Sequence, residues 1–543
     1  MTRNRRVTAG LAAALCALAI LAGCTSPVAG TARTTGGAAP ATTSQSAGTD
    51  TGTSTGPSPS SPIRPVPPSS VTASDSATAP GSVTGSPGSG SAIPPGDTAG
   101  ADGAGDPYYP TAGNGGYQVD KYTVVLTYDP ASNQLQANTT IAASVTSDRP
   151  LARFNLDLQP DLTVSTVTVD GAPAQFQHQD AELVITPADA LAPDAETRVE
   201  VAYSGRPGVI SGGTANLGDG GWHRTTDNGA IAAGEPFSAS AWYPVNEHPS
   251  DTAAFSVTAT VPTGWEVISN GVKFDGALPQ APAGMHSVRY DQARPIASYL
   301  TTIMIDKLTF TTGSFEGKPI VNAFTTAGAK DKDLAEHTAK VLSVLSKHFG
   351  PFPFDAYGGI YTGENLTFAL ETATRPVYAS WVDLDTVVHE TAHQWYGDDV
   401  TIERWSDICL NECFASYAPW LYHQDVDGAD LDAHWKDQMA AVAGDASFWS
   451  IPLVDMGAGK EFTSVYDRGP LAVHALRHEM GEQAFAELLK GWIATYGGKN
   501  AGFDDLESYA SKLAGKDLTP FMDAWFRGTV VPPEPYRTPP GLG

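Results

Sequence analysis

The chain has 543 residues, too many for one hydrophobic core, so its length predicts two or three domains. It carries 59 acidic and 32 basic residues, a formal net charge of −27. Because nucleic acids and anionic membrane surfaces are bound through basic patches, this charge balance argues against both as partners.

Residues 1–24 have the layout of a bacterial lipoprotein signal peptide. A basic start, MTRNRR, precedes an apolar run, VTAGLAAALCALAILAG, that is too short for a membrane-spanning helix. The run ends in LAGC, which resembles a lipobox whose cysteine, Cys24, becomes lipidated. A plain secretory signal or an uncleaved anchor is the alternative. We expect an extracytoplasmic protein that is lipid-anchored to the bacterial cell membrane or envelope.

Residues 25–112 consist mostly of Ser, Thr, Pro, Gly and Ala. They show almost no apolar periodicity and almost no charge, so they cannot bury enough surface to offset the entropy lost on ordering. We expect a disordered tether. Its Ser and Thr content invites glycosylation, which the sequence does not reveal.

Residues 113–307 have the pattern of an all-β domain. Short alternating runs rich in Val and Thr, such as YQVDKYTVVLTYD and LTVSTVTVDG, are separated by turn residues. A single all-β domain of this length fits a β-sandwich.

Residues 308–537 have mainly helical patterns with some strands, and residues 538–543 form a tail. The segment DKDLAEHTAKVLSVLSKHFG places its Leu and Val residues on one stripe and ends in glycine, a helix stop signal. The fold class is therefore a multidomain one, an all-β domain followed by a mainly helical α+β domain.

The stretch VVHETAHQWYGDDV, residues 387–400, contains the order His-Glu-x-x-His. Four residues are close to one helical turn, so His389 and His393 project from one face and can share a metal ion. Glu390 lies beside that ion, placed to take a proton from a bound water. A catalytic zinc site has three protein ligands, and Glu412, on a second helical segment, is the candidate third.

A second histidine pair, His474 and His478 in HALRH, also has helical spacing. No glutamate follows its first histidine, and the sequence shows no evident third ligand. We interpret this pair as packing or surface residues.

The stretch HETAHQWYGDDVT…WSDICLNECFASY resembles the signature of the aminopeptidase N family of zinc metallopeptidases, the gluzincins. FALET, residues 368–372, stands where that family carries GAMEN, and SVYDRGPLAVHALR resembles its Tyr-x-Lys-Gly stretch. The resemblance extends over residues 115–537 and implies that the helical domain is a thermolysin-like catalytic domain.

The resemblance implies a role for each of these polar residues. His389, His393 and Glu412 would bind one Zn²⁺ ion, and Glu390 would be the general base. Tyr466 would stabilise the oxyanion of the tetrahedral transition state.

The resemblance also implies a substrate site formed by Glu235, Ala369 and Glu371. The two carboxylates would hold the free α-ammonium of a peptide, which fixes the N-terminus one residue from the scissile bond. Substrate contacts depart from the family pattern at four positions, which are Ala233, Phe368, Thr372 and Arg468. These departures put the preferred N-terminal residue in doubt.

Cys16 and Cys24 belong to the signal peptide, which leaves Cys409 and Cys413 on either side of the proposed ligand Glu412. In an exported chain a disulfide can persist, so we expect these two to be bridged, with two buried free thiols as the alternative. Pro419 lies inside the same helical pattern, and we expect it to kink or end the helix.

We expect a membrane-tethered zinc aminopeptidase that acts on peptides with a free N-terminus. The long C-terminal helical domain of larger family members has no counterpart here, so we expect an open cleft that accepts longer peptides. Two alternatives stay open: a non-catalytic envelope binding lipoprotein on a peptidase fold, and a zinc hydrolase of a non-peptide substrate, like the family's epoxide hydrolases. The sequence does not reveal the oligomeric state.

Overall fold

A computed structural model describes residues 96, 98–211 and 217–542. The signal peptide, the lipidation expected at Cys24 and the tether up to residue 95 lie outside the described residues. Within the described part, no helix has the length and apolar character needed to cross a membrane.

The first part of the described chain is built from three sheets. The largest contains β2 (Tyr117–Asp129), β3 (Gln134–Val145), β5 (Leu162–Val169), β6 (Ala172–Pro173), β9 (Glu196–Gly205), β13 (Thr252–Pro262), β15 (Val272–Lys273) and β16 (Met285–Ala297). Its strand order is β15-β16-β13-β2-β3-β9-β5-β6. Its strands are antiparallel except that β13 and β2 run parallel, so this pair needs a long connection along the chain.

Two smaller sheets complete this part. One contains β1 (Thr98–Ala99), β4 (Leu151–Asp157), β7 (Gln175–Gln179) and β8 (Glu182–Thr186), in the order β1-β4-β8-β7. The other contains β10 (Val209–Ile210), β11 (Gly220–Arg224), β12 (Ala230–Ala232), β14 (Glu266–Ser269) and β17 (Ile303–Asp306), in the order β10-β11-β12-β17-β14. The sheets share one buried apolar core.

Strand β2 shows how the alternating sequence produces a half-buried sheet. Tyr122, Val124 and Leu126 are buried, while Val125 between them is exposed, because successive side chains point to opposite faces. An irregularity between Val119 and Lys121 shifts the register against β3, so the alternation changes phase there without losing the buried face.

The expected end of the tether at residue 112 is wrong, because residues 98–112 are part of the folded structure. Strand β1 pairs with β4 through Thr98 and Leu151. Asp106 is buried and accepts a hydrogen bond from the backbone N–H of Trp405, in the catalytic region, at 2.8 Å. Contacts made by a few residues thus hold this segment in the fold, although its overall composition is typical of disorder.

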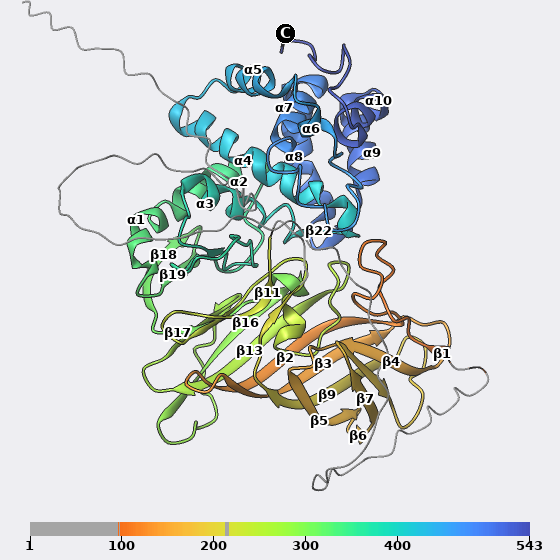
Figure 1. The fold of residues 1–543 in the computed structure, drawn as a ribbon, viewed down its shortest axis with the longest axis vertical. Coiled ribbons are helices and arrows are strands. Elements are labelled where there is room, and N and C mark those ends of the chain that lie inside the picture. The colour runs from red at the N-terminus through yellow and green to blue at the C-terminus, as the bar shows by residue number, and fades with distance from the viewer. Residues whose placement is uncertain (1–95, 97, 212–216, 543) are drawn as a thin grey trace, which may run out of the picture. The chain divides into compact units, whose positions relative to one another are not determined.

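The second part of the described chain begins with a small sheet and continues mainly in helices. The sheet contains β18 (Thr309–Phe315), β19 (Lys318–Phe324), β20 (Ile360–Tyr361) and β21 (Val377–Tyr378), in that order, and β22 (Val400–Ile402) pairs with β23 (Lys499–Ala501). The α-helices are α1 (Lys332–Ala335), α2 (Thr338–Phe349), α3 (Leu384–Ala392), α4 (Cys409–Asp427), α5 (Leu431–Val442), α6 (Ala446–Trp449), α7 (Gly469–Met480), α8 (Glu482–Tyr496), α9 (Phe503–Ala514) and α10 (Thr519–Met522). Figure 1 shows the sheets and the helices as two groups. The prediction of an N-terminal β region followed by a mainly helical catalytic region is confirmed.

Helix α4 passes through Pro419 and ends at Gly428, whose φ of 71° is the left-handed conformation that favours glycine. The proline therefore does not end the helix. Pro419 is fully buried together with most of the first ten residues of α4, so tertiary packing compensates for the hydrogen bond that proline cannot make.

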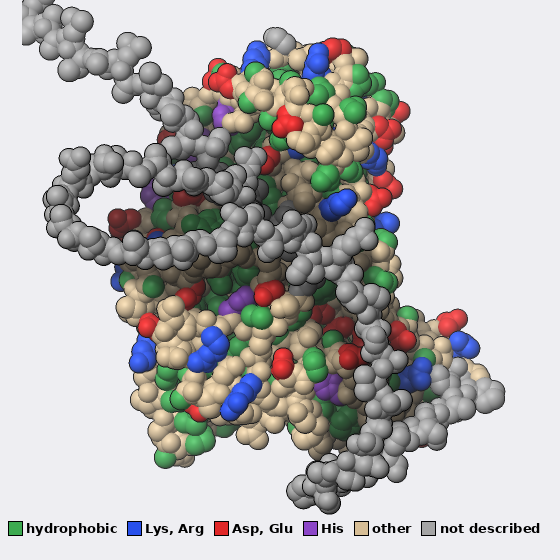
Figure 2. Space-filling model, in the orientation of Figure 1, with side chains coloured by type: hydrophobic (Ala, Val, Ile, Leu, Met, Phe, Trp, Pro, Cys, Tyr) green, Lys and Arg blue, Asp and Glu red, His purple; other side chains and the backbone are tan. Residues whose placement is uncertain are grey.

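The surface carries charges of both signs. On the face drawn in Figure 2, Asp and Glu side chains are interspersed with Lys and Arg over the described residues.

Candidate metal centre

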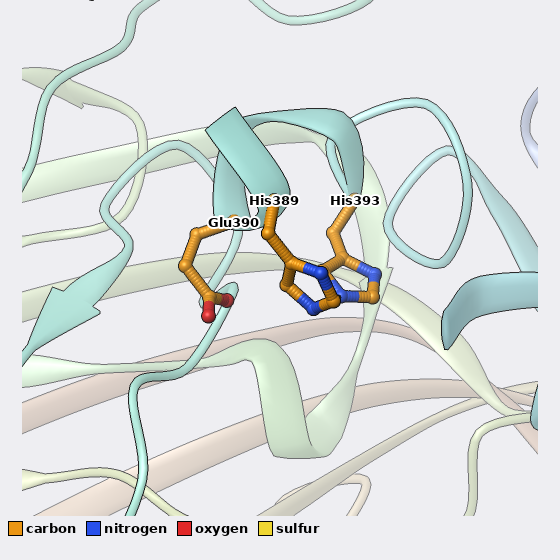
Figure 3. A group of neighbouring side chains, drawn as sticks. All are labelled: His389, Glu390 and His393. Carbon is orange, nitrogen blue, oxygen red and sulfur yellow. The ribbon is translucent and has the colours of Figure 1, made fainter. Parts of the chain in front are cut away.

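Helix α3 carries the histidine pair. The side chain of Asp383 accepts a hydrogen bond from the backbone N–H of Thr386 at 2.9 Å and so caps the start of the helix. His389 lies in the last turn, and His393 is the residue that ends the helix. Both rings are buried and point the same way, and their Nε2 atoms are 3.0 Å apart (Figure 3).

Helix α4 brings Glu412 to the same place. Its Oε2 lies 3.2 Å from Nε2 of His389 and 3.5 Å from Nε2 of His393. The two helices are held in register by Tyr396, which follows α3 and stacks on Phe414 of α4 with ring centroids 4.7 Å apart. The structure thus brings the predicted ligand Glu412 to both histidines, although eighteen residues separate it from the histidine motif.

The three donor atoms form a triangle with sides of 3.0, 3.2 and 3.5 Å. Tetrahedral zinc, with bonds to nitrogen and oxygen of about 2.1 Å, separates neighbouring ligand atoms by about 3.4 Å. The donor set of two imidazoles and one carboxylate is one that catalytic zinc uses. The residues present therefore fit a zinc ion with one position left for water or substrate.

The backbone fixes the ring of His393 in the form that a metal needs. Nδ1 of His393 lies 3.0 Å from the carbonyl oxygen of Tyr396, so an N–H at Nδ1 donates to that carbonyl and leaves the lone pair of Nε2 free. Burial lowers the pKa of His389, an effect that its contact with Glu412 opposes, and Nδ1 of His389 has no hydrogen-bond partner among the described residues.

Without a bound cation, several buried carboxyl groups lie close together in the site. Burial raises the pKa of Glu235 well above its ordinary value, and Glu371 and Glu412 raise it further. Burial also raises the pKa of Glu412, but His393 and His389 outweigh it and lower the pKa to about 2. Glu412 is therefore ionised at neutral pH, and a divalent cation would offset the repulsion among these buried carboxylates.

Glu390 lies beside the histidines rather than between them. Its carboxylate and the ligand nitrogens of His389 and His393 lie within 4.8 Å of one another, and Figure 3 shows its side chain diverging from the two rings. It is buried, and burial, followed by Glu371 and Glu412, raises its pKa well above the ordinary range. A carboxylate with a raised pKa next to a metal position is suited to proton transfer.

Glu371 and Glu235 are both buried, and after burial itself, Glu371 and Glu412 raise the pKa of Glu235. One oxygen of each, Oε1, has no hydrogen-bond partner among the described residues. The loop of Glu371 is held by Gln394, which donates from Nε2 to the Glu371 carbonyl at 3.0 Å and accepts from the Thr374 N–H at 2.8 Å. Ala369 is buried in the same loop. Sequence reasoning missed the role of Gln394, which directly follows His393.

Tyr466 precedes α7 and lies next to the histidine pair, with its ring centroid 6.0 Å from that of His389. Burial, followed by Glu412, raises its pKa well above the ordinary value, so the phenol stays protonated and can donate a hydrogen bond. Arg468, two residues later, is buried and donates to the carbonyls of Ile451 at 2.7 Å and Gly528 at 2.9 Å. These contacts give Arg468 a structural role rather than a place at the substrate.

Cys409 and Cys413 are joined in the structure by a disulfide within the first turns of α4. The bridge packs against the start of α7, since a Cβ atom at Gly469 would lie 2.9 Å from Sγ of Cys413. The turn that carries Glu412 therefore packs closely against the segment that follows Tyr466.

The segment assigned to the tether also reaches the site. The hydroxyl of Tyr109 donates to the carboxylate of Glu461, and its ring meets Phe237 edge-on with centroids 4.9 Å apart. Glu461 is fully buried, and its charge contributes to the raised pKa of Glu235. Sequence reasoning missed both residues. The available signal was YYP at residues 108–110, an aromatic pair in a segment otherwise poor in aromatic residues.

Two histidines one turn apart, a glutamate from a second helix and a carboxylate beside the first histidine define a gluzincin site. A family model described as the peptidase family M1 domain matches residues 359–525. This match, together with the curated relatives and solved structures described below, supports an aminopeptidase N family gluzincin, and M1 zinc metallopeptidases have a single catalytic zinc ion.

Curated relatives support this assignment. The chain is 23% identical over 417 residues to Aminopeptidase M1-C of Oryza sativa subsp. japonica, covering 68% of this chain and 46% of the relative. It is 25% identical over 316 residues to Aminopeptidase N of Streptomyces lividans, covering 51% of this chain and 36% of the relative. The chain thus spans about half the length of the curated relatives it matches, or less.

The solved structures match a larger share of this chain than the curated relatives do. An M1 zinc metallopeptidase from Deinococcus radiodurans has a TM-score of 0.73 and 27% sequence identity, over 81% of this chain and 99% of that chain. A mutant M1 zinc metallopeptidase from the same organism, bound to a Tyr-Ser-Ala substrate, has a TM-score of 0.72 and 27% identity, over 80% and 100%.

Proposed function

We propose that this protein is a zinc-dependent aminopeptidase that removes residues from the N-terminus of peptides. The observation that carries the proposal is the pair of buried carboxylates, Glu235 and Glu371, each with an oxygen free to accept, next to a three-ligand metal site. A buried anion without a partner is costly, and the ammonium group of a peptide N-terminus would supply that partner. The tripeptide substrate of the Deinococcus radiodurans relative also supports a peptide substrate.

The residues of the chain have distinct tasks in this mechanism. When bound, the zinc ion supplies Lewis-acid chemistry that polarises a carbonyl and acidifies a water molecule. Glu390 accepts a proton from that water and returns it to the leaving amine, a transfer that its raised pKa favours. Tyr466, protonated at neutral pH, donates a hydrogen bond to the oxyanion that develops on the former carbonyl.

The carboxylates decide which bond is cut. Glu371 and Glu235 would hold the α-ammonium at a fixed distance from the reacting carbonyl, so the first peptide bond alone reaches Glu390. A substrate with a blocked N-terminus leaves these two carboxylates buried and unpaired, which penalises its binding.

The test compares aminoacyl fluorogenic substrates with their N-acetylated forms. We expect activity on the free amines alone, lost with a chelator and restored by zinc. Glu371→Gln removes one charge-assisted contact, worth about 1.5–3 kcal/mol, so kcat/KM should fall roughly 10- to 100-fold. Glu336→Gln, an exposed glutamate of the same domain, is the matched control and should leave kcat/KM unchanged. Equal activity on the N-acetylated substrates would refute the amine-binding role.

Two other outcomes would favour the alternative functions. Zinc binding without hydrolysis of any aminoacyl substrate would favour a binding lipoprotein on a peptidase fold. Chelator-sensitive opening of an epoxide, unaffected by Glu371→Gln, would favour a zinc hydrolase of non-peptide substrates.

We also propose that the enzyme is tethered outside the cytoplasmic membrane by a lipid on Cys24. The support is the signal pattern that ends in LAGC and the long Ser/Thr/Pro/Gly/Ala segment after it. Cys24→Ser should abolish incorporation of labelled fatty acid and release the protein from the membrane fraction. Cys16→Ser, in the same signal peptide, is the control, and equal membrane association of both variants would contradict the proposal.

A further inference from the structure

Helices α5 and α7 bring together a second cluster of potential metal ligands. Nε2 of His474 and Nε2 of His478 lie 3.1 and 2.9 Å from the same oxygen, Oδ1 of Asp432. His474 and His478 are one turn apart on α7, and Asp432 lies in the first turn of α5. The third ligand that the sequence did not reveal is therefore present, 42 residues before His474.

The cluster has the same arrangement of potential ligands as the catalytic site. In both, two histidines four residues apart on one helix meet a carboxylate from another helix, with comparable distances between donor atoms. Each Nδ1 of the second pair also faces an oxygen. Nδ1 of His474 lies 2.8 Å from the hydroxyl of Tyr417, and Nδ1 of His478 lies 3.4 Å from the carbonyl of Pro540. Such contacts orient histidines whose Nε2 binds a metal.

The exposure of the cluster and the charges around it also suit a bound cation. The side chain of His474 is 1% exposed, that of His478 is 14% exposed and that of Asp432 is 43% exposed, so the cluster is closed on one side and open on the other. The nearby cation Arg477 is paired with Glu482 through two hydrogen bonds and does not neutralise Asp432.

We propose that Asp432, His474 and His478 form a second site for a divalent cation. Two imidazoles and one carboxylate favour a borderline ion such as Zn²⁺, with water in the remaining position. Ala475 follows His474 where Glu390 follows His389, so the second site has no general base and does not hydrolyse peptides. Its ion joins α5 to α7 and, through Tyr417, to α4, the helix that carries Glu412.

The same three side chains can also form a hydrogen-bonded cluster in which Asp432 accepts from two N–H groups. Zinc stoichiometry distinguishes the two states. Untagged full-length protein is dialysed against zinc buffers of increasing free concentration, and bound zinc per chain is measured by mass spectrometry of the metal. We expect two equivalents, the second weaker, and an affinity of the second site at least tenfold lower in Asp432→Ala and in His478→Gln.

The two variants replace partly exposed residues, and circular dichroism with the remaining zinc equivalent shows whether each is folded. His423→Ala is the matched control, because His423 also contacts two carboxylates, Asp385 and Asp427, and should leave both equivalents in place. One equivalent in the unaltered protein at every zinc concentration would overturn the proposal. Two equivalents in both folded variants would overturn it as well, because the second ion would then lie elsewhere.

Discussion

The surroundings of Tyr466 keep its phenol in the protonated form, which can donate a hydrogen bond. It lies beside His389, and burial, followed by the carboxylate of Glu412, raises its pKa well above the ordinary value, so it stays protonated at neutral pH. A neutral donor in a site of low dielectric interacts most strongly with charge that develops during the reaction. Tyr466 is therefore suited to stabilise the transition state more than the bound substrate.

Tyr466→Phe should lower kcat by about 100- to 1000-fold while KM changes little, because one oxyanion donor is lost. Zinc content should stay unchanged, since Tyr466 is not a ligand. Steady-state kinetics with an aminoacyl substrate measure both constants. A mutant that loses zinc, or one with a raised KM and normal kcat, would contradict this role.

Asp106 holds residues 98–112 in the fold, and its ionisation makes the stability of the fold depend on pH. Burial raises the pKa of Asp106, but hydrogen bonds from His248 and from backbone N–H groups outweigh it and lower the pKa. A lowered pKa in the folded state means that this carboxylate stabilises the fold above its unfolded value of 3.8, and that the stabilisation is lost as the pH falls through the folded pKa.

Asp106→Asn should therefore lower the free energy of unfolding by about 1.5–3 kcal/mol at pH 7, and by less below pH 4. Denaturant unfolding at pH 7 and pH 3.5 measures the difference. Asp102→Asn, an exposed aspartate of the same segment, should have a small effect at both. A deficit for Asp106→Asn that is the same at both pH values would contradict the argument.

Sequence pattern located the site residues that belong to a motif and missed those that do not. His389, Glu390 and His393 follow from helical spacing alone. Tyr109 and Glu461 are 352 residues apart and have no motif, so their contact depends on how the folded regions pack. The same reason explains why Asp432 was not assigned to His474 and His478.

At the scale of elements, α4 supplies the third metal ligand to the histidine pair of α3. Its first turn carries Glu412 and the disulfide, and its middle carries Pro419. Because proline has no N–H, the carbonyl four residues earlier, that of Ala415, has no helical N–H to accept from. Sequence reasoning expected Pro419 to kink or end the helix, whereas α4 continues to Asp427.

The disulfide of α4 closes a short loop, so its entropic contribution is about 2 kcal/mol in the chain-entropy model and its main effect is local. The unreduced protein should give no alkylated Cys409 or Cys413 in peptide mass spectrometry. Cys409→Ala/Cys413→Ala should weaken zinc binding more than it lowers overall stability. Two alkylatable thiols in the exported protein would exclude the bridge.

At the scale of the whole molecule, the site is formed by both regions of the fold. The helical region supplies Glu371 and the zinc ligands, and the β region supplies Glu235. Alternating and helical periodicity predicted these regions, because burial of one face determines the period of each element. The packing of residues 98–112 onto both regions was not predictable, since it depends on a few contacts such as that of Asp106 with Trp405.

The most direct test of the central claim, peptide hydrolysis at the zinc site, is the activity of Glu390→Gln measured together with its zinc content. Glu390 transfers the proton without binding the ion, so the variant should keep its catalytic zinc and lose at least about 100-fold in kcat on an aminoacyl substrate. Retained activity in the zinc-loaded variant, or activity of the unaltered protein that survives complete removal of zinc, would contradict it.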